Sequence, residues 1–64
     1  MDVPSEADLI VALVASQYRS QFELVNQTQC PCGQITTHLR EREDGTLYWV
    51  ESISDLRKLS LFLA

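Results

Sequence analysis

The sequence predicts a small α+β domain in which an N-terminal helix packs on an antiparallel sheet of three to four strands. A capping serine precedes the apolar run Leu9–Ala15, and Asp44-Gly45 separates two β-prone runs. Of the 64 residues, 45% are hydrophobic and 22% are charged, which is globular rather than disordered composition. A chain of this length is expected to form one domain over residues 1–64.

The N-terminal helix is predicted to run from Ser5 to about Ser20. Ser5 suits the N-cap, and Asp8 stands where the acid of a capping box reaches back. The apolar arc of Leu9–Ala15 extends almost round the helix, so more than one side should be buried. We favour a helix laid across the sheet with its alanines facing out. The alternative is a homodimer through Leu9–Ala15.

A strand and a sharp turn are expected to follow. Gln21–Thr28 alternates apolar and polar residues around Phe22 and Leu24, which is typical of a strand. Pro31 then fixes its own φ, and Gly33 permits a positive φ. The chain is therefore expected to reverse between residues 29 and 33.

The segment Ile35–Glu51 predicts a β-hairpin, because Asp-Gly favours a two-residue type I′ turn with φ > 0 at both central positions. Such a turn at Asp44-Gly45 places Leu39 opposite Val50 on the core face. We expect the other face to be open, with the Arg40 guanidinium against the Trp49 indole. The cross-strand pairs predicted on that face are Arg40–Trp49, Arg42–Leu47 and His38–Glu51.

The C-terminal segment fits two structures. As a helix it begins at Ser52, and its apolar residues stand at helical spacing: Ile53, Leu56, Leu59 and Leu63. As a strand it alternates through Leu59, Leu61 and Leu63. We favour the strand, because a hairpin followed by a tight turn and a short final strand is common in SH3-like and Sm-like barrels.

The charge of the chain restricts its partners. A net charge of −4 and a pI of about 4.6 argue against a dedicated nucleic-acid binder and suit a basic partner surface. The longest uncharged apolar run, Leu9–Ala15, is far shorter than the roughly 20 residues that span a bilayer. Acidic residues precede it and no basic n-region is present, so we expect a cytoplasmic protein.

Cys30, Cys32 and His38 suggest a metal site, but a structural zinc site normally needs four ligands. We therefore expect two reduced thiols and neither metal nor cofactor. A Cys30–Cys32 disulfide would close a very small, strained ring, and Cys-x-Cys is not the Cys-x-x-Cys of redox enzymes. No recognisable motif places a nucleophile beside His38, so we expect no catalysis.

The predicted outer face combines residue types that are common in protein interfaces. The partner-binding residues expected there are His38, Arg40, Arg42, Leu47 and Trp49. The chain is thus predicted to be a non-enzymatic protein-binding module that acts as an adaptor, regulator or inhibitor of a partner protein. One alternative is a nucleic-acid-associated barrel that uses Arg40, Arg42 and Trp49, because basic and aromatic groups hold phosphates and bases. Another is a small metal-binding module that uses Cys30, Cys32 and His38.

Overall fold

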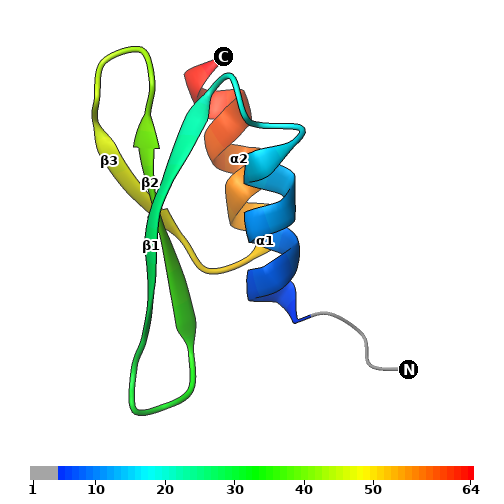
Figure 1. Cartoon of the computed structure of the whole chain (residues 1–64), viewed down its shortest axis with the longest axis vertical. Helices are drawn as coiled ribbons and strands as arrows, with labels where there is room; N and C mark the ends of the chain where they lie inside the picture. Colours follow the sequence, from blue (N-terminus) through cyan, green and yellow to red (C-terminus); the bar gives the residue numbers. More distant parts are fainter. Residues whose placement is uncertain (1–4) are drawn as a thin grey trace.

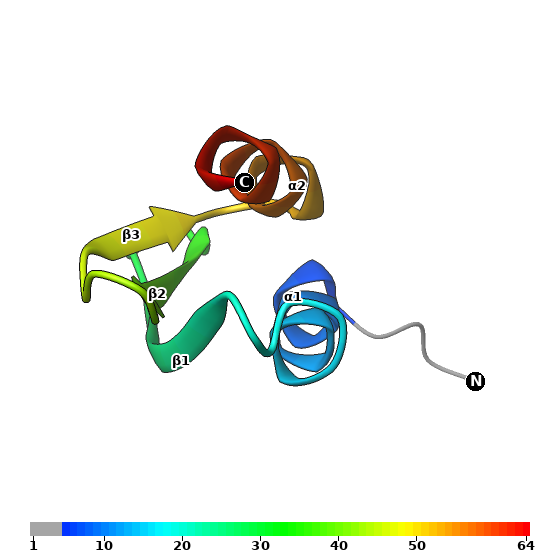
Figure 2. The ribbon, with the colours of Figure 1, turned by 90° about the horizontal axis from the view of Figure 1, so that it is seen from above.

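The computed structural model describes residues 5–64 and has two layers. A three-stranded antiparallel sheet forms one layer, and both helices pack against one face of it (Figures 1 and 2). The elements in chain order are α1 (Glu6–Ala15), β1 (Phe22–Gln29), β2 (Ile35–Glu41), β3 (Leu47–Val50) and α2 (Ile53–Leu63). This arrangement confirms the predicted α+β class with a small antiparallel sheet.

Helix α1 begins where the sequence predicts, because the Ser5 side chain accepts a hydrogen bond from the Asp8 backbone N–H at 3.2 Å. Ile10 and Val14 face the core, whereas the alanines at positions 12 and 15 are exposed. The helix ends at Ala15, so the prediction that it continues to about Ser20 is wrong. At Ser16 the backbone leaves helical geometry (φ −122°, ψ −79°), and a run of turns leads into β1.

The strands follow the order β1-β2-β3, and β1 carries a bulge between Leu24 and Asn26. Across β2 and β3, Leu39 lies opposite Tyr48 and His38 lies opposite Trp49. The predicted pairs are therefore wrong by two residues along β2. Because the shift is even, the side chains of the residues that pair across β2 and β3 keep their predicted faces.

The β2–β3 loop explains this shift. Glu41 and Thr46 close the loop, with the Glu41 N–H donating to the Thr46 carbonyl at 2.8 Å. The Gly45 N–H donates back to the Glu41 carbonyl at 2.9 Å. Gly45 has a φ of 77°, but Asp44 has no positive φ, so the two-residue type I′ turn does not form. The loop instead spans residues 42–45.

The C-terminal segment forms helix α2, so the prediction of a final strand there is wrong. Ser52 caps it by accepting a hydrogen bond from the Asp55 N–H at 3.1 Å, and Leu56 is fully buried. Helical spacing lets Ile53, Leu59 and Leu63 pack beside Leu56 on the core. The sheet of the described residues therefore has three strands, and the likeness to SH3-like or Sm-like barrels is not confirmed.

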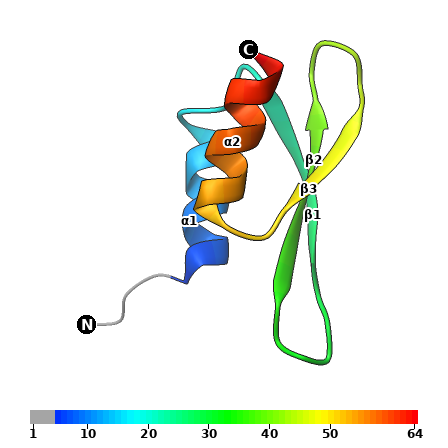
Figure 3. The ribbon, with the colours of Figure 1, turned by 180° about the vertical axis from the view of Figure 1, so that it is seen from behind.

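The core lies between the two layers and draws on every element. The two turns of the sheet lie at opposite ends of the molecule: the β2–β3 turn is near the C-terminal end of α2, and the β1–β2 turn extends past the start of α1 (Figures 1 and 3). The buried hydrophobic residues of the core are Ile10, Val14, Phe22, Leu39, Val50 and Leu56.

Within residues 5–64, the helices are too short or too polar to cross a membrane.

Candidate functional site

The sheet face that points away from the helices carries two large apolar side chains. Trp49 is 67% exposed and Leu47 is 59% exposed, whereas Val50 between the layers is buried. Strand alternation explains this contrast, because neighbouring residues of β3 point to opposite faces. We define the outer face by Glu23, His38, Arg40, Leu47 and Trp49, which the strand pairing places together.

The structure confirms the predicted exposure of Trp49 but changes its neighbours. His38 lies directly opposite Trp49, and Arg40 lies directly opposite Leu47. The prediction that Arg40 faces Trp49 is therefore wrong, and so are the other two pairs on this face. The cause is the loop over residues 42–45, which is longer than a two-residue turn.

Glu23 of β1 links the two arginines of the candidate site. Its carboxylate oxygens lie 3.6 Å from Arg40 Nη1 and 3.6 Å from Arg42 Nη1. All three side chains are about half exposed, so these pairs add little stability, but they offset both positive charges. Sequence reasoning missed Glu23, although its place between Phe22 and Leu24 in an alternating strand already indicates an outward side chain.

Arg42 belongs to the loop rather than to the strand. Its Nε donates a 2.7 Å hydrogen bond to the carbonyl of Arg19, and its side chain lines a surface hollow with Ser16 and Ser20. The loop thereby connects to the segment that follows α1. Arg42 thus lies at the border of the outer face, unlike the four other predicted site residues.

His38 is partly buried, and its Nε2 lies 3.0 Å from Thr28 Oγ1, within hydrogen-bond distance. This contact ties the imidazole to β1. In residues 5–64, the structure brings together no group of three His, Cys, Asp or Glu side chains that could hold a metal ion. Cys30 and Cys32 do not join His38 in a ligand set.

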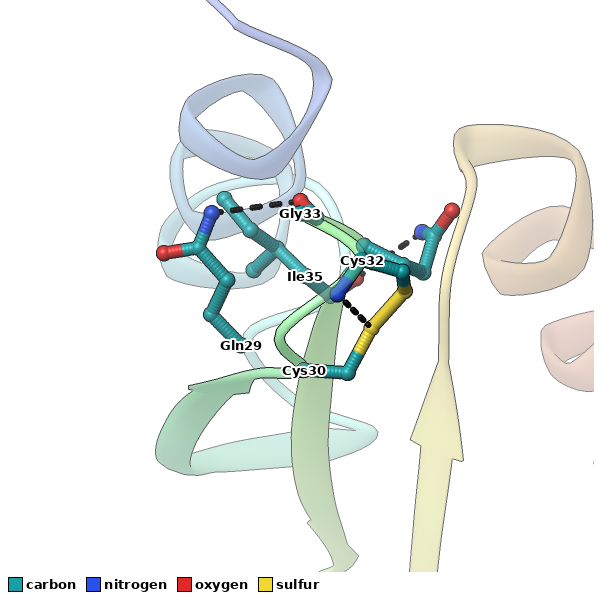
Figure 4. The surroundings of a disulfide bond; sticks show 6 residues. Gln29, Cys30, Cys32, Gly33 and Ile35 are labelled. Atoms are coloured by element: carbon teal, nitrogen blue, oxygen red, sulfur yellow. Dashed lines mark hydrogen bonds between the residues drawn. A yellow bond between two sulfur atoms is a disulfide. The ribbon is translucent and has the colours of Figure 1, made fainter.

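Cys30 and Cys32 form a disulfide at the β1–β2 turn, so the prediction of two reduced thiols is wrong (Figure 4). The turn brings their Cα atoms to 5.2 Å, inside the range of about 4.4–6.8 Å that a disulfide can join. Gly33 supports this turn with a φ of 95°, and its N–H donates to the Cys30 carbonyl at 2.9 Å. Each sulfur is bonded to the other and is not free to bind a metal in this state.

Glu41 is a buried carboxyl group beneath the β2–β3 loop, 7% exposed. A side-chain hydrogen bond with Asp44, together with burial, raises its pKa. The nearby Asp44 carboxylate accepts the Thr46 N–H at 2.9 Å, and this bond lowers the pKa of Asp44. The pKa values of the two neighbouring carboxyl groups are therefore shifted in opposite directions, with Glu41 the one that holds its proton more readily.

A second exposed apolar pair lies near the end of α2, where Leu61 is 78% exposed and Phe62 is 82% exposed. The expected strand put Leu61 on one side with Leu59 and Leu63, but the helix turns it outward. These side chains lie outside the outer face as defined above.

Comparison of the chain with protein-family models gives no match, and neither do comparisons with curated proteins and with solved structures. Function is therefore inferred from the geometry of residues 5–64.

Proposed function

We propose that this chain is a small, non-enzymatic protein-binding module that acts as an adaptor, regulator or inhibitor of a partner protein. The main support for this proposal is the exposure of Trp49. This residue is 67% exposed and lies beside Leu47 on the outer face. Tryptophan supplies a large share of binding energy when a partner covers it. Both helices pack on the other face of the sheet (Figure 2), and they leave Trp49 exposed.

Charge supports a protein partner more than a nucleic acid. The chain carries a net charge of −4, and Glu23 lies against both Arg40 and Arg42. Phosphate binding relies on uncompensated positive charge, which these pairs reduce. The nucleic-acid alternative on Arg40, Arg42 and Trp49 is therefore less well supported. The metal-binding alternative loses two ligands to the Cys30–Cys32 disulfide.

The decisive experiment compares the parent chain with Trp49→Ala and Phe62→Ala as immobilised baits in an extract of the source cells. Phe62 is the matched control, because it is another aromatic side chain, 82% exposed against 67% for Trp49, and lies away from the outer face. We expect one or more proteins to bind the parent and Phe62→Ala, and to be lost with Trp49→Ala. Equal capture by all three baits would contradict the proposal. Salt-sensitive binding of a single-stranded oligonucleotide that requires Arg40 would favour the nucleic-acid alternative instead.

Two further parts of the proposal concern location and assembly. A cytoplasmic location stays a prediction, and the disulfide weighs against it because disulfides persist mainly in oxidising compartments.

A homodimer through Leu9–Ala15 also stays a proposal. The exposed alanines of α1 and the 39% exposure of Leu9 support it, whereas burial of Ile10 and Val14 shows that the core already takes one side of the helix.

A further inference from the structure

The β1–β2 turn carries a disulfide that the proposed function does not use. Residues 29–34 are all exposed, both cysteines among them, and the turn extends past the start of α1 (Figure 1). We propose that Cys30–Cys32 is a thiol–disulfide exchange site, which takes two electrons from a pair of thiols on another protein.

The disulfide is accessible to a thiolate on another protein. Exchange begins when a thiolate approaches one sulfur, so an exposed disulfide reacts far more readily than a buried one. The Cys30–Cys32 bond lies in the β1–β2 turn, where both cysteines are exposed. A protein thiol can therefore approach without any movement of the core.

The two sulfurs differ in their hydrogen bonding. The Cys32 backbone N–H donates to Cys30 Sγ at 3.2 Å. A hydrogen bond to sulfur stabilises the thiolate form, and a more stable thiolate is a better leaving group. The incoming thiolate should accordingly attack Cys32 Sγ and release Cys30 as the thiolate.

The exchange takes place in two steps, and atoms and electrons balance in each. In the first, a substrate thiolate forms a bond to Cys32 Sγ while the Cys30–Cys32 bond breaks and its electron pair goes to Cys30 Sγ. In the second, the other substrate thiolate attacks the first substrate sulfur and releases the Cys32 thiolate. The substrate leaves with a disulfide, and the two protons of its thiols pass through solvent to Cys30 and Cys32.

The turn has supports other than the sulfur bond. The Cys30 N–H donates to the Gln34 carbonyl at 3.0 Å, and Gln29 Nε2 donates to the Gly33 carbonyl at 3.2 Å. The Gly33 N–H bond to the Cys30 carbonyl closes the same turn. Opening the disulfide should therefore leave the β1–β2 connection in place, so that it can close again.

Charge near the turn favours one source of thiols. Gly33 and Gln34 line a surface hollow together with Glu6 and Glu51. Two carboxylates on this side repel an anionic thiol such as glutathione and attract a cationic one. A thiol pair on a neutral or basic protein segment is thus the better substrate.

The experiment mixes the oxidised full-length chain with a reduced cationic peptide that holds two cysteines, or with glutathione at equal thiol concentration. Acid quenching and mass spectrometry then measure the reduced chain and the oxidised peptide. We expect both to appear together in equal amounts, and at least several-fold faster than reduction by glutathione. A chain that stays oxidised in excess peptide would overturn the exchange site. Faster reduction by glutathione would overturn the choice of a protein thiol.

A second experiment tests which of the two sulfurs is attacked. With a cationic peptide that holds a single cysteine, we expect the mixed disulfide to map to Cys32. In the single variants, the Cys30 thiol of Cys32→Ser should be alkylated at lower pH than the Cys32 thiol of Cys30→Ser. Equal amounts of mixed disulfide at Cys30 and Cys32, or the same pH dependence of alkylation in the two single variants, would contradict the assigned order of attack.

The double variant Cys30→Ser/Cys32→Ser should keep the circular dichroism spectrum of the parent. A loss of folded structure would show that the disulfide is structural instead.

Discussion

Trp49 lies directly opposite His38 across β2 and β3, and the imidazole of His38 is in turn held by Thr28 of β1. The outer face is therefore a surface to which all three strands contribute. Its exposed indole is supported by a residue that is tied to the far edge of the sheet. Trp49 therefore lies within a paired strand and not in a loop.

Trp49→Ala should leave the fold nearly as stable as the parent. With 67% of the side chain exposed, the loss should be confined to its cross-strand contacts, roughly 0.2–1 kcal/mol. A core tryptophan would cost about 3–5 kcal/mol. Urea unfolding followed by circular dichroism measures the difference. An unfolded variant, or parent fluorescence that resists a soluble quencher, would show that Trp49 is buried.

Gly45→Val should destabilise the hairpin. Gly45 has a φ of 77°, which a β-branched residue rarely adopts, and we expect a loss of roughly 1–3 kcal/mol. An added Cβ would meet no atom within 4 Å, so the cost comes from the backbone and not from crowding. Gly45→Asn is the control, because asparagine tolerates positive φ better. Equal denaturation midpoints for parent and Gly45→Val would contradict the loop geometry.

Glu41→Gln should stabilise the chain at neutral pH. The pKa of Glu41 lies above its ordinary value of 4.5 in the folded state, so folding favours the protonated carboxyl. That contribution is complete below the ordinary value and is lost as pH rises through the folded pKa. Glutamine resembles the protonated form at every pH. Thermal melts should therefore favour Glu41→Gln at about pH 7, and the two proteins should converge at about pH 4.

Asp44 provides the opposite control for this pH dependence. Its pKa lies below its ordinary value of 3.8, so its contribution is present above that value and is lost as pH falls through the lower folded pKa. Asp44→Asn should therefore destabilise the chain at neutral pH. Should Glu41→Gln melt below the parent at neutral pH, the buried position of Glu41 beside Asp44 would be contradicted.

Ala12→Glu tests self-association through α1. Ala12 is exposed, so a glutamate there should leave the monomer folded while charge disrupts a helix–helix interface. If α1 forms a dimer interface, light scattering on concentrated samples shows the parent as a dimer and the variant shifted toward monomer. Ala12→Ser, small and uncharged, serves as the control. A parent that stays monomeric at the highest concentration would rule out the homodimer.

Short-range signals in the sequence account for much of this fold. Ser5 and Ser52 both act as caps, because an N-cap needs only a side-chain oxygen and the next turn of backbone. Leu39 and Val50 face the core and Trp49 faces out, as alternation predicts. These features depend on neighbours a few residues away, which the sequence displays directly.

Only the tertiary structure decided the features that involve distant residues. The strand register follows the hydrogen-bonded closure of the β2–β3 loop, and a loop of different length keeps the same alternation but changes every partner. The C-terminal segment has both strand and helix periodicity, and burial of Leu56 against the shared core selects the helix. Likewise, Glu23 meets Arg40 and Arg42 only once β1 pairs with β2, because ion pairs between segments require the sheet that brings them together.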